Sequence, residues 1–313
     1  MSAIRLGGGP EFDRIRAIAA ALGDRATGLG DDVAWLEVGE RHLAVSTDVS
    51  VEGVHFRRDW LAPPEIGWRA AAAALSDLAA AGAEPLGVLV AMTAPADEGP
   101  ATLAALMDGV GSAAAAAGTG VLGGDLSRGT ALSLAITVVG VSERILRRSG
   151  AEPGDGLWVT GELGGARAAL AAWRAGRTPA AAARERFARP EPRLAAGAWL
   201  AAHGATAMLD LSDGLGGDAG HLAAASGVRL RIALERLPVH PAVPAEADAA
   251  GEAPELFAAR GGEDFELLAA MPPGFTAASP FPLTRIGEVE AGRGVALELG
   301  GRPVSVPGYG HFA

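Results

Sequence analysis

Short acidic motifs recur along this chain, and most of them open with a small residue. They are Gly30-Asp31-Asp32, Ser46-Thr47-Asp48, Ser76-Asp77, Gly123-Gly124-Asp125 and Asp210-Leu211-Ser212-Asp213-Gly214. Two carboxylates 4 Å apart repel by roughly 1 kcal/mol in water and about 4 kcal/mol near a protein surface, so a fold that gathers them needs cations. Mg²⁺ takes oxygen ligands, usually one or two carboxylates together with water and phosphate oxygens. The pattern therefore predicts a fold that assembles distant segments around Mg-nucleotide.

The length and composition predict a globular protein of two domains. A chain of 313 residues exceeds what one ordinary core holds. Its content of 49% hydrophobic and 20% charged residues is typical of folded, soluble proteins. The apolar stretches 70–94 and 113–122 are interrupted by charges or too short to span a bilayer, and the first residues lack the apolar core of a signal peptide. We therefore expect a cytoplasmic protein without a membrane partner.

Charge and residue usage exclude several function classes. A net charge of −11 disfavours a nucleic-acid partner, which would require a basic face. The chain has no cysteine, which removes disulfides, thiolate nucleophiles and cysteine-ligated metals. It also has no lysine, so neither a Schiff base nor a P-loop lysine is available. Any ATP chemistry must therefore use another scaffold.

Hydrophobic periodicity predicts helices and strands in both halves of the chain. In the first half we expect helices at 10–22, 65–81 and 97–117 and strands at 33–38, 42–47, 86–92, 119–122 and 131–141. In the second half we expect helices at 163–175, 190–203 and 213–226, strands at 157–160, 206–210, 228–234, 266–270, 283–287 and 295–299, and a loop at 238–255. The fold class is therefore α/β, or mixed α+β. We predict domains at 1–141 and 157–313, joined by a linker at 142–156.

Most of the acidic motifs also have a plain structural interpretation. Asp31-Asp32 fits a solvated loop pair, and Ser46-Thr47-Asp48 fits the turn at the end of a strand. Paired glycines at Gly123-Gly124-Asp125 would let backbone amides approach a phosphate, but they also fit a simple turn. Ser212 or Asp213 fits a helix N-cap, although two aspartates and a serine at one strand end exceed what a cap needs.

Asp77 is the most informative of these carboxylates. It lies in the middle of an alanine-rich helical stretch, where aspartate is unfavourable and is almost never buried without a partner. Arg69 lies eight residues away, which is not the spacing of an ion pair on one helix face. We therefore predict that Asp77 contacts a metal or a ligand.

Three further features are weak signals when taken alone. Gly261-Gly262-Glu263-Asp264-Phe265-Glu266 is another acidic turn before an apolar strand. Tyr309 is the only tyrosine and lies near the C-terminus, where packing is the simpler explanation. His55 lies in a predicted loop, where a histidine is usually just exposed.

The order and spacing of the motifs nevertheless resemble those of a known family. The chain reads, in order, GDD, STD with VEGVHF, LSDLAAAGAEP, GGD, RRSGAEPGD, RPEPR, LDLSDGL, GGEDFEL and GYGHF. Over essentially its whole length this resembles the thiamine-monophosphate kinases, a family of the aminoimidazole-ribonucleotide-synthetase-like superfamily. The resemblance implies an N-terminal domain that binds ATP and several Mg²⁺ ions and forms a homodimer through its sheet. It also implies a C-terminal α/β domain that completes the nucleotide and substrate sites.

The resemblance also assigns residues to roles. As magnesium ligands it implies Asp32, Ser46, Thr47, Asp48, Asp77, Asp125, Asp210 and Asp213. As ATP contacts it implies Gly124, Asp125, Arg148 and Ser212, and as thiamine-phosphate contacts His55, Glu263 and Tyr309. The chain departs from the family pattern at Ala74, Ala81, Leu126 and Phe265, none of which is an implied ligand.

The implied reaction is Mg-assisted, in-line transfer of the γ-phosphoryl of ATP to thiamine monophosphate, the last step of thiamine diphosphate biosynthesis. No general base is expected, because a phosphate acceptor with a second pKa near ~6 is already mostly deprotonated at neutral pH. Metal-bound Asp77, Asp125 and Asp213, together with Arg148, would carry the transfer. Other superfamily members that act on a related phosphate acceptor, and a non-catalytic Mg-nucleotide sensor, remain alternatives. The absence of cysteine disfavours the selenophosphate synthetases and the hydrogenase-maturation relatives.

Overall fold

A five-stranded sheet forms the first half of the chain, in the order β1-β2-β5-β3-β4. Its strands are β1 (Ala34–Val38), β2 (Arg41–Val51), β3 (Glu84–Ala94), β4 (Val121–Arg128) and β5 (Ser133–Ser142). Neighbouring strands are antiparallel except β3 and β4, which run parallel. The computed structural model describes residues 5–25 and 29–310, so Gly28 and the last residues of the GYGHF motif, His311 and Phe312, lie outside it.

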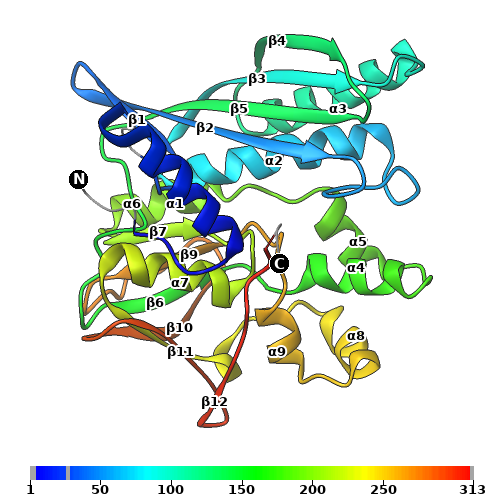
Figure 1. Ribbon diagram of the computed structural model, residues 1–313. Helices are drawn as coiled ribbons and strands as arrows, with labels where there is room; N and C mark the ends of the chain where they lie inside the picture. The colour runs from blue at the N-terminus through cyan, green and yellow to red at the C-terminus, as the bar shows by residue number, and fades with distance from the viewer. Residues whose placement is uncertain (1–4, 26–28, 311–313) are drawn as a thin grey trace.

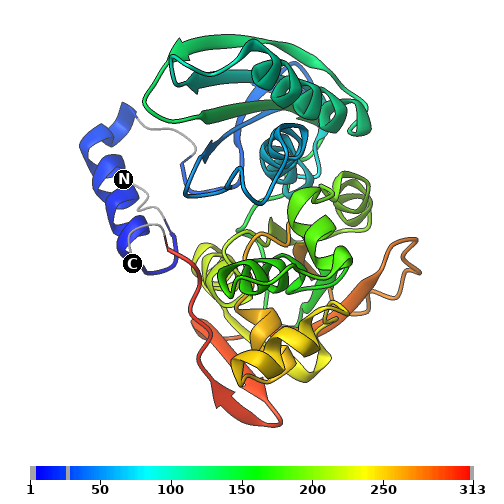
Figure 2. The same cartoon turned by 90° about the vertical axis from the view of Figure 1, so that its right-hand side faces the viewer.

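Helices α2 (Pro63–Ala80) and α3 (Pro100–Ala116) cover one face of this sheet (Figure 1). Two glycines allow them to pack closely. A Cβ at Gly67 would lie 1.9 Å from the carbonyl oxygen of Leu106, and a Cβ at Gly109 would lie 1.9 Å from that of Pro64. Alanine at either position would therefore push the helices apart. Among the described residues, no helix lies on the opposite face of the sheet (Figure 2).

The second half contains a seven-stranded sheet in the order β12-β11-β8-β10-β6-β9-β7. Its strands are β6 (Gly156–Thr160), β7 (Ala207–Asp210), β8 (Arg229–Ala233), β9 (Leu267–Met271), β10 (Leu283–Glu290), β11 (Gly294–Leu299) and β12 (Arg302–Val304). Its helices are α4 (Gly165–Arg174), α5 (Ala181–Ala188), α6 (Leu194–Ala202), α7 (Leu215–Ser226), α8 (Val243–Ala250) and α9 (Pro254–Ala259), with a short 3₁₀ turn at Leu234–Arg236. A second 3₁₀ turn, Gly23–Arg25, lies in the first half of the chain.

Helix α2 packs against both halves of the chain and therefore lies at their junction. Its residues Ile66, Leu75 and Leu78 belong to a core shared with the first sheet, whereas Ala79 and Ala80 pack in a cluster with α6, β7 and β9. Twelve of its 18 residues are buried and the others are partly buried. Any polar side chain on α2 is therefore held at the junction of the two halves.

Helix α1 (Pro10–Leu22) stands to one side of the molecule (Figure 2) and buries none of its residues. It is attached to α7 through His221. The Phe12 ring lies 4.1 Å from the His221 ring, and the backbone N–H of Gly7 donates to His221 Nδ1 over 3.0 Å. No helix in the described residues is long and apolar enough to cross a membrane.

The mixed α/β class is confirmed, and most elements lie where the sequence predicts them. β5 ends at Ser142 and β6 begins at Gly156, around the segment predicted as a linker, while the domain limits themselves stay a prediction. Three predictions are wrong. Ser46-Thr47-Asp48 lies inside β2 and not at its end, and Gly123-Gly124-Asp125 lies inside β4 and not in a turn. Segment 238–255 holds α8 and the start of α9, because proline is favourable in the first turn of a helix.

Two smaller elements were missed. The helix expected at 190–203 begins only at Leu194, and a separate helix, α5, precedes it. The Pro190 and Pro192 that divide the two helices explain the break, since the residue before a proline is pushed out of helical conformation. Strand β12 was not predicted, because three residues are too few to show an alternating pattern.

Candidate active site

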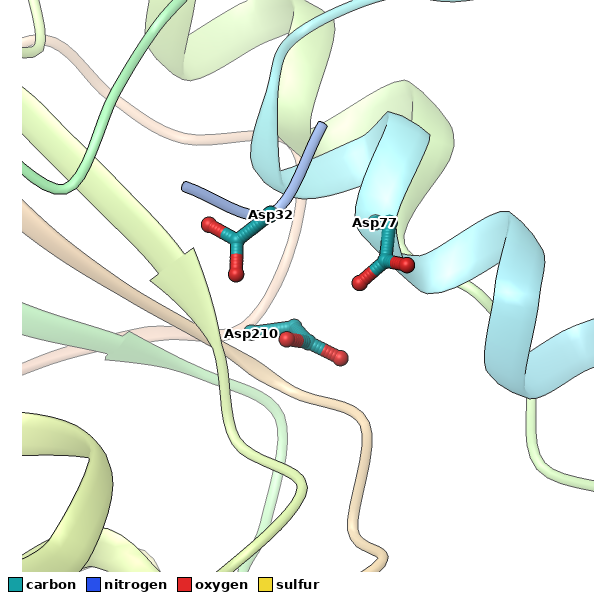
Figure 3. Close-up of side chains that lie close together, drawn as sticks. All are labelled: Asp32, Asp77 and Asp210. Atoms are coloured by element: carbon teal, nitrogen blue, oxygen red, sulfur yellow. The ribbon is translucent and has the colours of Figure 1, made fainter. Parts of the chain in front are cut away.

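Three carboxylates from distant segments meet where the two halves join (Figure 3). Asp32 precedes β1, Asp77 lies on α2 and Asp210 ends β7. One oxygen of each lies within 4.8 Å of the others. Asp32 and Asp210 are buried and Asp77 is partly buried, so bulk water screens their repulsion poorly.

Strand β2 supplies two more oxygen-bearing side chains to this cluster. Ser46 and Asp48 lie on the face of β2 that turns toward α2, because alternate residues of a strand share a face. The Ser46 hydroxyl donates to Asp77 Oδ2 over 2.5 Å, and Asp48 lines the same pocket. This pocket, of about 280 Å³, is called the acidic pocket below.

Burial and repulsion by neighbouring charges raise the pKa values of Asp77 and Asp210. Burial, followed by the charge of Asp32, raises the pKa of Asp210 to about 7. Burial and the charges of Asp48, Asp210 and Asp32 raise the pKa of Asp77 well above its usual value. Without cations, protons therefore occupy part of the pocket at neutral pH. The donors are all oxygen atoms, which is the donor set that suits Mg²⁺.

Arg148 lies against the acidic pocket as a cation. Its Nη2 is 2.5 Å from Asp32 Oδ1, and its backbone N–H donates to Asp31 Oδ1 over 3.0 Å. Although burial opposes the charged form, Asp32 raises the pKa of this guanidinium. Burial and the Asp32 charge in turn raise the pKa of Asp31 to about 6. Arg148 thus offsets only part of the negative charge.

The segment after β7 connects the acidic pocket to a larger cleft. Ser212 and Asp213 line both cavities, as do Asp48 and Phe265. The Asp213 backbone N–H donates to Asp218 Oδ2 over 3.1 Å at the start of α7. A ligand that reaches from one cavity to the other would pass these residues.

The larger cleft has a volume of about 790 Å³ and brings together His55, Glu263 and Tyr309. His55 Nδ1 accepts the backbone N–H of Val51 over 3.1 Å, which orients the ring. The Tyr309 backbone N–H donates to the Asp213 carbonyl oxygen over 2.8 Å, and this ties the C-terminal segment to the acidic loop. Three residues that are distant in the sequence therefore line the same cleft.

Aromatic side chains form another wall of this cleft. The rings of Trp60 and Trp173 stack with centroids 5.1 Å apart, and Phe187 meets Trp173 edge-on at 5.3 Å. Such a wall is suited to a flat heteroaromatic molecule.

Family models match both halves of the chain. The N-terminal domain of AIR synthase related proteins matches residues 30–142 and the C-terminal domain matches residues 152–300. The thiamine-monophosphate kinase of Aquifex aeolicus is 34% identical over 96% of this chain and 98% of its own length. That of Salmonella typhimurium is 37% identical over 96% of both chains. The chain belongs to the thiamine-monophosphate kinase family.

A solved structure of the family matches the fold throughout. It is described as AaThiL complexed with AMPPCP and TMP, and it superposes with a TM-score of 0.89 at 33% identity. The match covers 100% of this chain and 99% of that one. The two-domain architecture expected from the resemblance to thiamine-monophosphate kinases is thereby confirmed.

In this family member the loop at residues 261–266 divides its side chains between the cleft and the interior. Glu263 and Phe265 line the cleft, and both have positive backbone φ angles, 64° and 50°. Such angles are unfavourable outside glycine and persist only where the surroundings fix them. Asp264 and Glu266 are buried, with exposed fractions of 1% and 0%.

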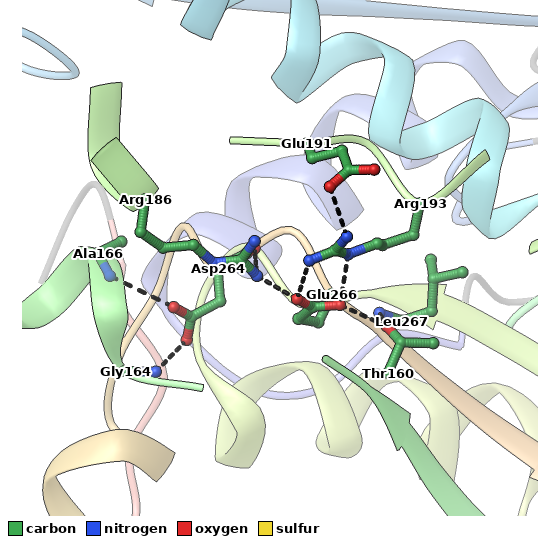
Figure 4. A network of polar contacts seen from close by, with 9 residues as sticks. All are labelled: Thr160, Gly164, Ala166, Arg186, Glu191, Arg193, Asp264, Glu266 and Leu267. Atoms are coloured by element: carbon green, nitrogen blue, oxygen red, sulfur yellow. Dashed lines mark hydrogen bonds and ion pairs between the residues drawn. The ribbon is translucent and has the colours of Figure 1, made fainter. Parts of the chain in front are cut away.

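The two buried carboxylates hold this loop in place (Figure 4). Asp264 accepts the backbone N–H of Gly164 over 2.7 Å. Glu266 pairs with Arg186 and with Arg193, whose Nη2 lies 2.7 Å from Oε1, and it accepts the Thr160 hydroxyl over 2.6 Å. The network therefore compensates for the strained backbone at Glu263 and Phe265.

The structure does not bring every predicted site residue to the acidic pocket. Thr47 lies on the outer face of the first sheet, where its hydroxyl contacts the Thr137 hydroxyl at 2.9 Å. Gly124 and Asp125 lie on exposed edge strand β4. Across the sheet, Asp125 of β4 pairs with Ala91 of β3, which pairs with Ala135 of β5, which pairs with Val49 of β2. Asp125 therefore lies three strands from β2, or roughly 14 Å at ~4.8 Å per strand.

Sequence reasoning missed several residues around the two cavities. The structure adds Arg69, Asp218, Trp60, Trp173 and Phe187 to the walls, and Asp264, Glu266, Arg186 and Arg193 to the support of the loop. Arg69 carried a usable signal, since a charge in an apolar helix needs a partner. The aromatic residues had none, because isolated tryptophans fit any core.

Proposed function

We propose that this chain transfers the γ-phosphoryl group of ATP to the phosphate of thiamine monophosphate, giving thiamine diphosphate and ADP. One observation carries the proposal: an oxygen-lined acidic pocket shares Ser212 and Asp213 in its wall with a cleft lined by His55, Glu263 and Tyr309. Membership of the thiamine-monophosphate kinase family, and a solved relative that holds AMPPCP and TMP, support it. We propose that the reaction takes place in the cytoplasm, where ATP is supplied.

The oxygen donors of the acidic pocket suit magnesium ions. Asp32, Asp77 and Asp210 would hold them, with Ser46, Asp48 and Asp213 at the margins. When bound, Mg²⁺ neutralises phosphate oxygens so that an anionic acceptor can approach an anionic donor. The raised pKa values of Asp77 and Asp210 mean that loading displaces protons.

The remaining residues of the pocket act on the nucleotide directly. Arg148 offers a planar, permanently charged donor beside Asp32, suited to a phosphate oxygen. Ser212 is the other ATP contact that we propose in this pocket, whereas Gly124 lies on β4, away from it. No side chain is needed to remove a proton from the acceptor, whose phosphate is mostly ionised at neutral pH.

The cleft would orient the organic part of the acceptor. Tyr309 is 55% exposed and can close over a heteroaromatic ring, where a thiazolium cation favours an aromatic face. Glu263 would accept a hydrogen bond from the aminopyrimidine, and His55 would contact the same ligand. Binding the two substrates in adjoining cavities aligns the donor and acceptor phosphates.

A homodimer through the outer face of the first sheet completes the proposal. No helix of the described part of the chain covers this face. Apolar side chains are exposed on β1 to β4, among them Leu36 and Leu122, which are 62% and 63% exposed. A patch of this kind marks an interface in a protein outside membranes. Thr47 and Asp125 both lie in this sheet, too far apart within one chain to share an ion. We propose that they reach a metal together only across the interface.

The test is ADP release from Mg-ATP with and without thiamine monophosphate, with the product identified by mass spectrometry. Acceptor-dependent ADP and one equivalent of thiamine diphosphate are expected. ATP binding in calorimetry without any turnover would instead indicate a nucleotide sensor. Turnover with another phosphate acceptor alone would move the chain to a different reaction of the superfamily.

A further inference from the structure

The carboxylate of Glu263, which lies in the acceptor cleft, is paired with a buried guanidinium. Arg69 Nη2 contacts Glu263 Oε1, and both residues line the cleft. The Arg69 side chain is only 6% exposed, whereas that of Glu263 is 28% exposed. The pair therefore presents a carboxylate to the cleft and keeps the cation behind it.

Besides its own helix α2, two segments hold Arg69 in place: α5, through Phe187, and the loop at 261–266, through Glu263. Its Nη1 donates to the Phe187 carbonyl oxygen over 2.5 Å at the end of α5. Its guanidinium also lies over the Phe187 ring, with Cζ 3.8 Å from the centroid. A guanidinium held on one face and at two nitrogens has a single orientation, so the Glu263 oxygen that it binds is fixed as well.

The backbone of Glu263 is equally constrained. Its N–H donates to the Ser212 carbonyl oxygen over 2.7 Å, which joins the loop to the acidic segment. Gly262 permits this approach, because a Cβ there would lie 2.7 Å from the same oxygen. The φ of 64° at Glu263 is thus imposed by neighbours on both sides.

This arrangement determines which hydrogen bonds the carboxylate can make. An ionised carboxylate has only acceptor positions, and one oxygen of Glu263 already accepts from Arg69. What remains for a ligand is an acceptor in a fixed place. An amine N–H of the ligand can donate a hydrogen bond to this carboxylate oxygen. A carbonyl oxygen at the same position cannot donate, and its lone pairs would repel those of the carboxylate.

We propose that Arg69 is a positioning residue that fixes Glu263 as a hydrogen-bond acceptor and so makes the cleft selective for an aminopyrimidine over its 4-oxo counterpart. This rests on the proposed function, since it assigns the specificity of the acceptor site. A fully buried site that is built to accept a substrate N–H discriminates against an analogue without that N–H by about 10⁴-fold or more. Because Glu263 is partly exposed, we expect about 10²-fold in kcat/KM.

The experiment compares thiamine monophosphate with its 4-oxopyrimidine analogue as phosphate acceptor. It uses the full-length protein with Mg-ATP and measures the ratio of the two kcat/KM values. Arg69→Met keeps the volume of the side chain but frees Glu263, and we expect the ratio to fall at least about 10-fold. Glu263→Gln offers an N–H donor as well, and it should bring the ratio near one.

Arg184→Met is the matched control. Arg184 on α5 forms an ion pair with Glu65 on α2, at 2.7 Å, and neither residue lines the cleft. The substitution removes an arginine contact between the same two helices, so it reproduces any general loosening. The ratio should remain that of the unaltered protein.

The outcomes separate this inference from the proposed function. If Arg69→Met lowers both kcat/KM values equally, Arg69 supports the fold only and the inference is wrong. Calorimetric titration of both acceptors in the presence of Mg-ADP measures the same preference without turnover. A preference for the amine without phosphorylation would keep the inference and overturn the kinase reaction, whereas equal or absent binding of the two acceptors would overturn the inference.

Discussion

Two buried carboxylates, Asp210 in the acidic pocket and Glu266 under the loop at 261–266, have pKa values shifted in opposite directions. Their exposed fractions are 5% and 0%. Burial and the charge of Asp32 raise the pKa of Asp210 to about 7. Burial acts in the same direction on Glu266, but Arg186 and Arg193 outweigh it and leave the pKa lowered.

The difference lies in where the compensating charge comes from. Glu266 is neutralised by arginines of the chain itself, so the loop beside the acceptor cleft is complete without a ligand. Asp210 faces Asp32 and Asp77, with Arg148 paired to Asp32, and this pocket is completed by protons or by added cations. One region is preorganised, and the other depends on its ligands.

The largest effect is expected from breaking the preorganised region. Glu266→Ala leaves Arg186 and Arg193 buried without their carboxylate, which costs about 3–5 kcal/mol of unfolding free energy. Chemical denaturation followed by circular dichroism measures it. Glu191→Ala is the control, because Glu191 also pairs with Arg193 but is 74% exposed, and it should change stability by about 0.5 kcal/mol or less. Equal effects of the two substitutions would contradict this account.

The ligand-dependent region should behave in the opposite way. Asp77→Asn removes one of three clustered charges, so we expect kcat to fall by about 10²-fold or more while the Mg-free protein loses no stability. Steady-state kinetics and Mg-free thermal melts measure the two quantities. Asp13→Asn on exposed α1 is the control and should change neither. Normal turnover in Asp77→Asn would show that this carboxylate is not part of the reaction site.

The same contrast explains what the sequence could and could not predict. Asp77 was identifiable because an unpartnered aspartate inside an apolar helix is unfavourable, whatever the fold. The partners of Glu266 were not, because Arg186 and Arg193 become its neighbours only when the fold brings α5 and the segment after it beside the residue that precedes β9. Elements with a strong period, such as α2 and β5, were predicted well. The strand character of Gly123-Gly124-Asp125 was hidden, because pairing with β3 overrides the turn preference of glycine.

Within the cleft, Tyr309 should affect one substrate more than the other. Tyr309→Ala removes an exposed aromatic face from the wall, so we expect the KM for thiamine monophosphate to rise about 10-fold and the KM for ATP to stay within about twofold. Initial rates with each substrate varied in turn measure both constants. Tyr309→Phe is the control, since it retains the ring. A parallel rise in both KM values would place Tyr309 outside the acceptor site.

The smallest effect, and the one that joins the two regions, is the pH dependence of magnesium stabilisation. In the Mg-free protein Asp210 has its pKa raised to about 7 and Asp31 to about 6, above the usual value of 3.8. Between about pH 4 and pH 7 these two groups therefore hold more protons in the folded chain than in the unfolded chain, and their contribution to stability falls as the pH rises. Mg²⁺ binds the ionised carboxylates, so the increase in Tm on adding Mg²⁺ should be larger by several degrees at pH 8 than at pH 5.5. Differential scanning fluorimetry at both pH values measures this increase in Tm.

In Asp210→Asn the difference between the two pH values should shrink, whereas in Glu191→Ala it should persist. An increase in Tm that is independent of pH would mean that Mg²⁺ binds away from these carboxylates, and the acidic pocket would then be balanced by protons alone.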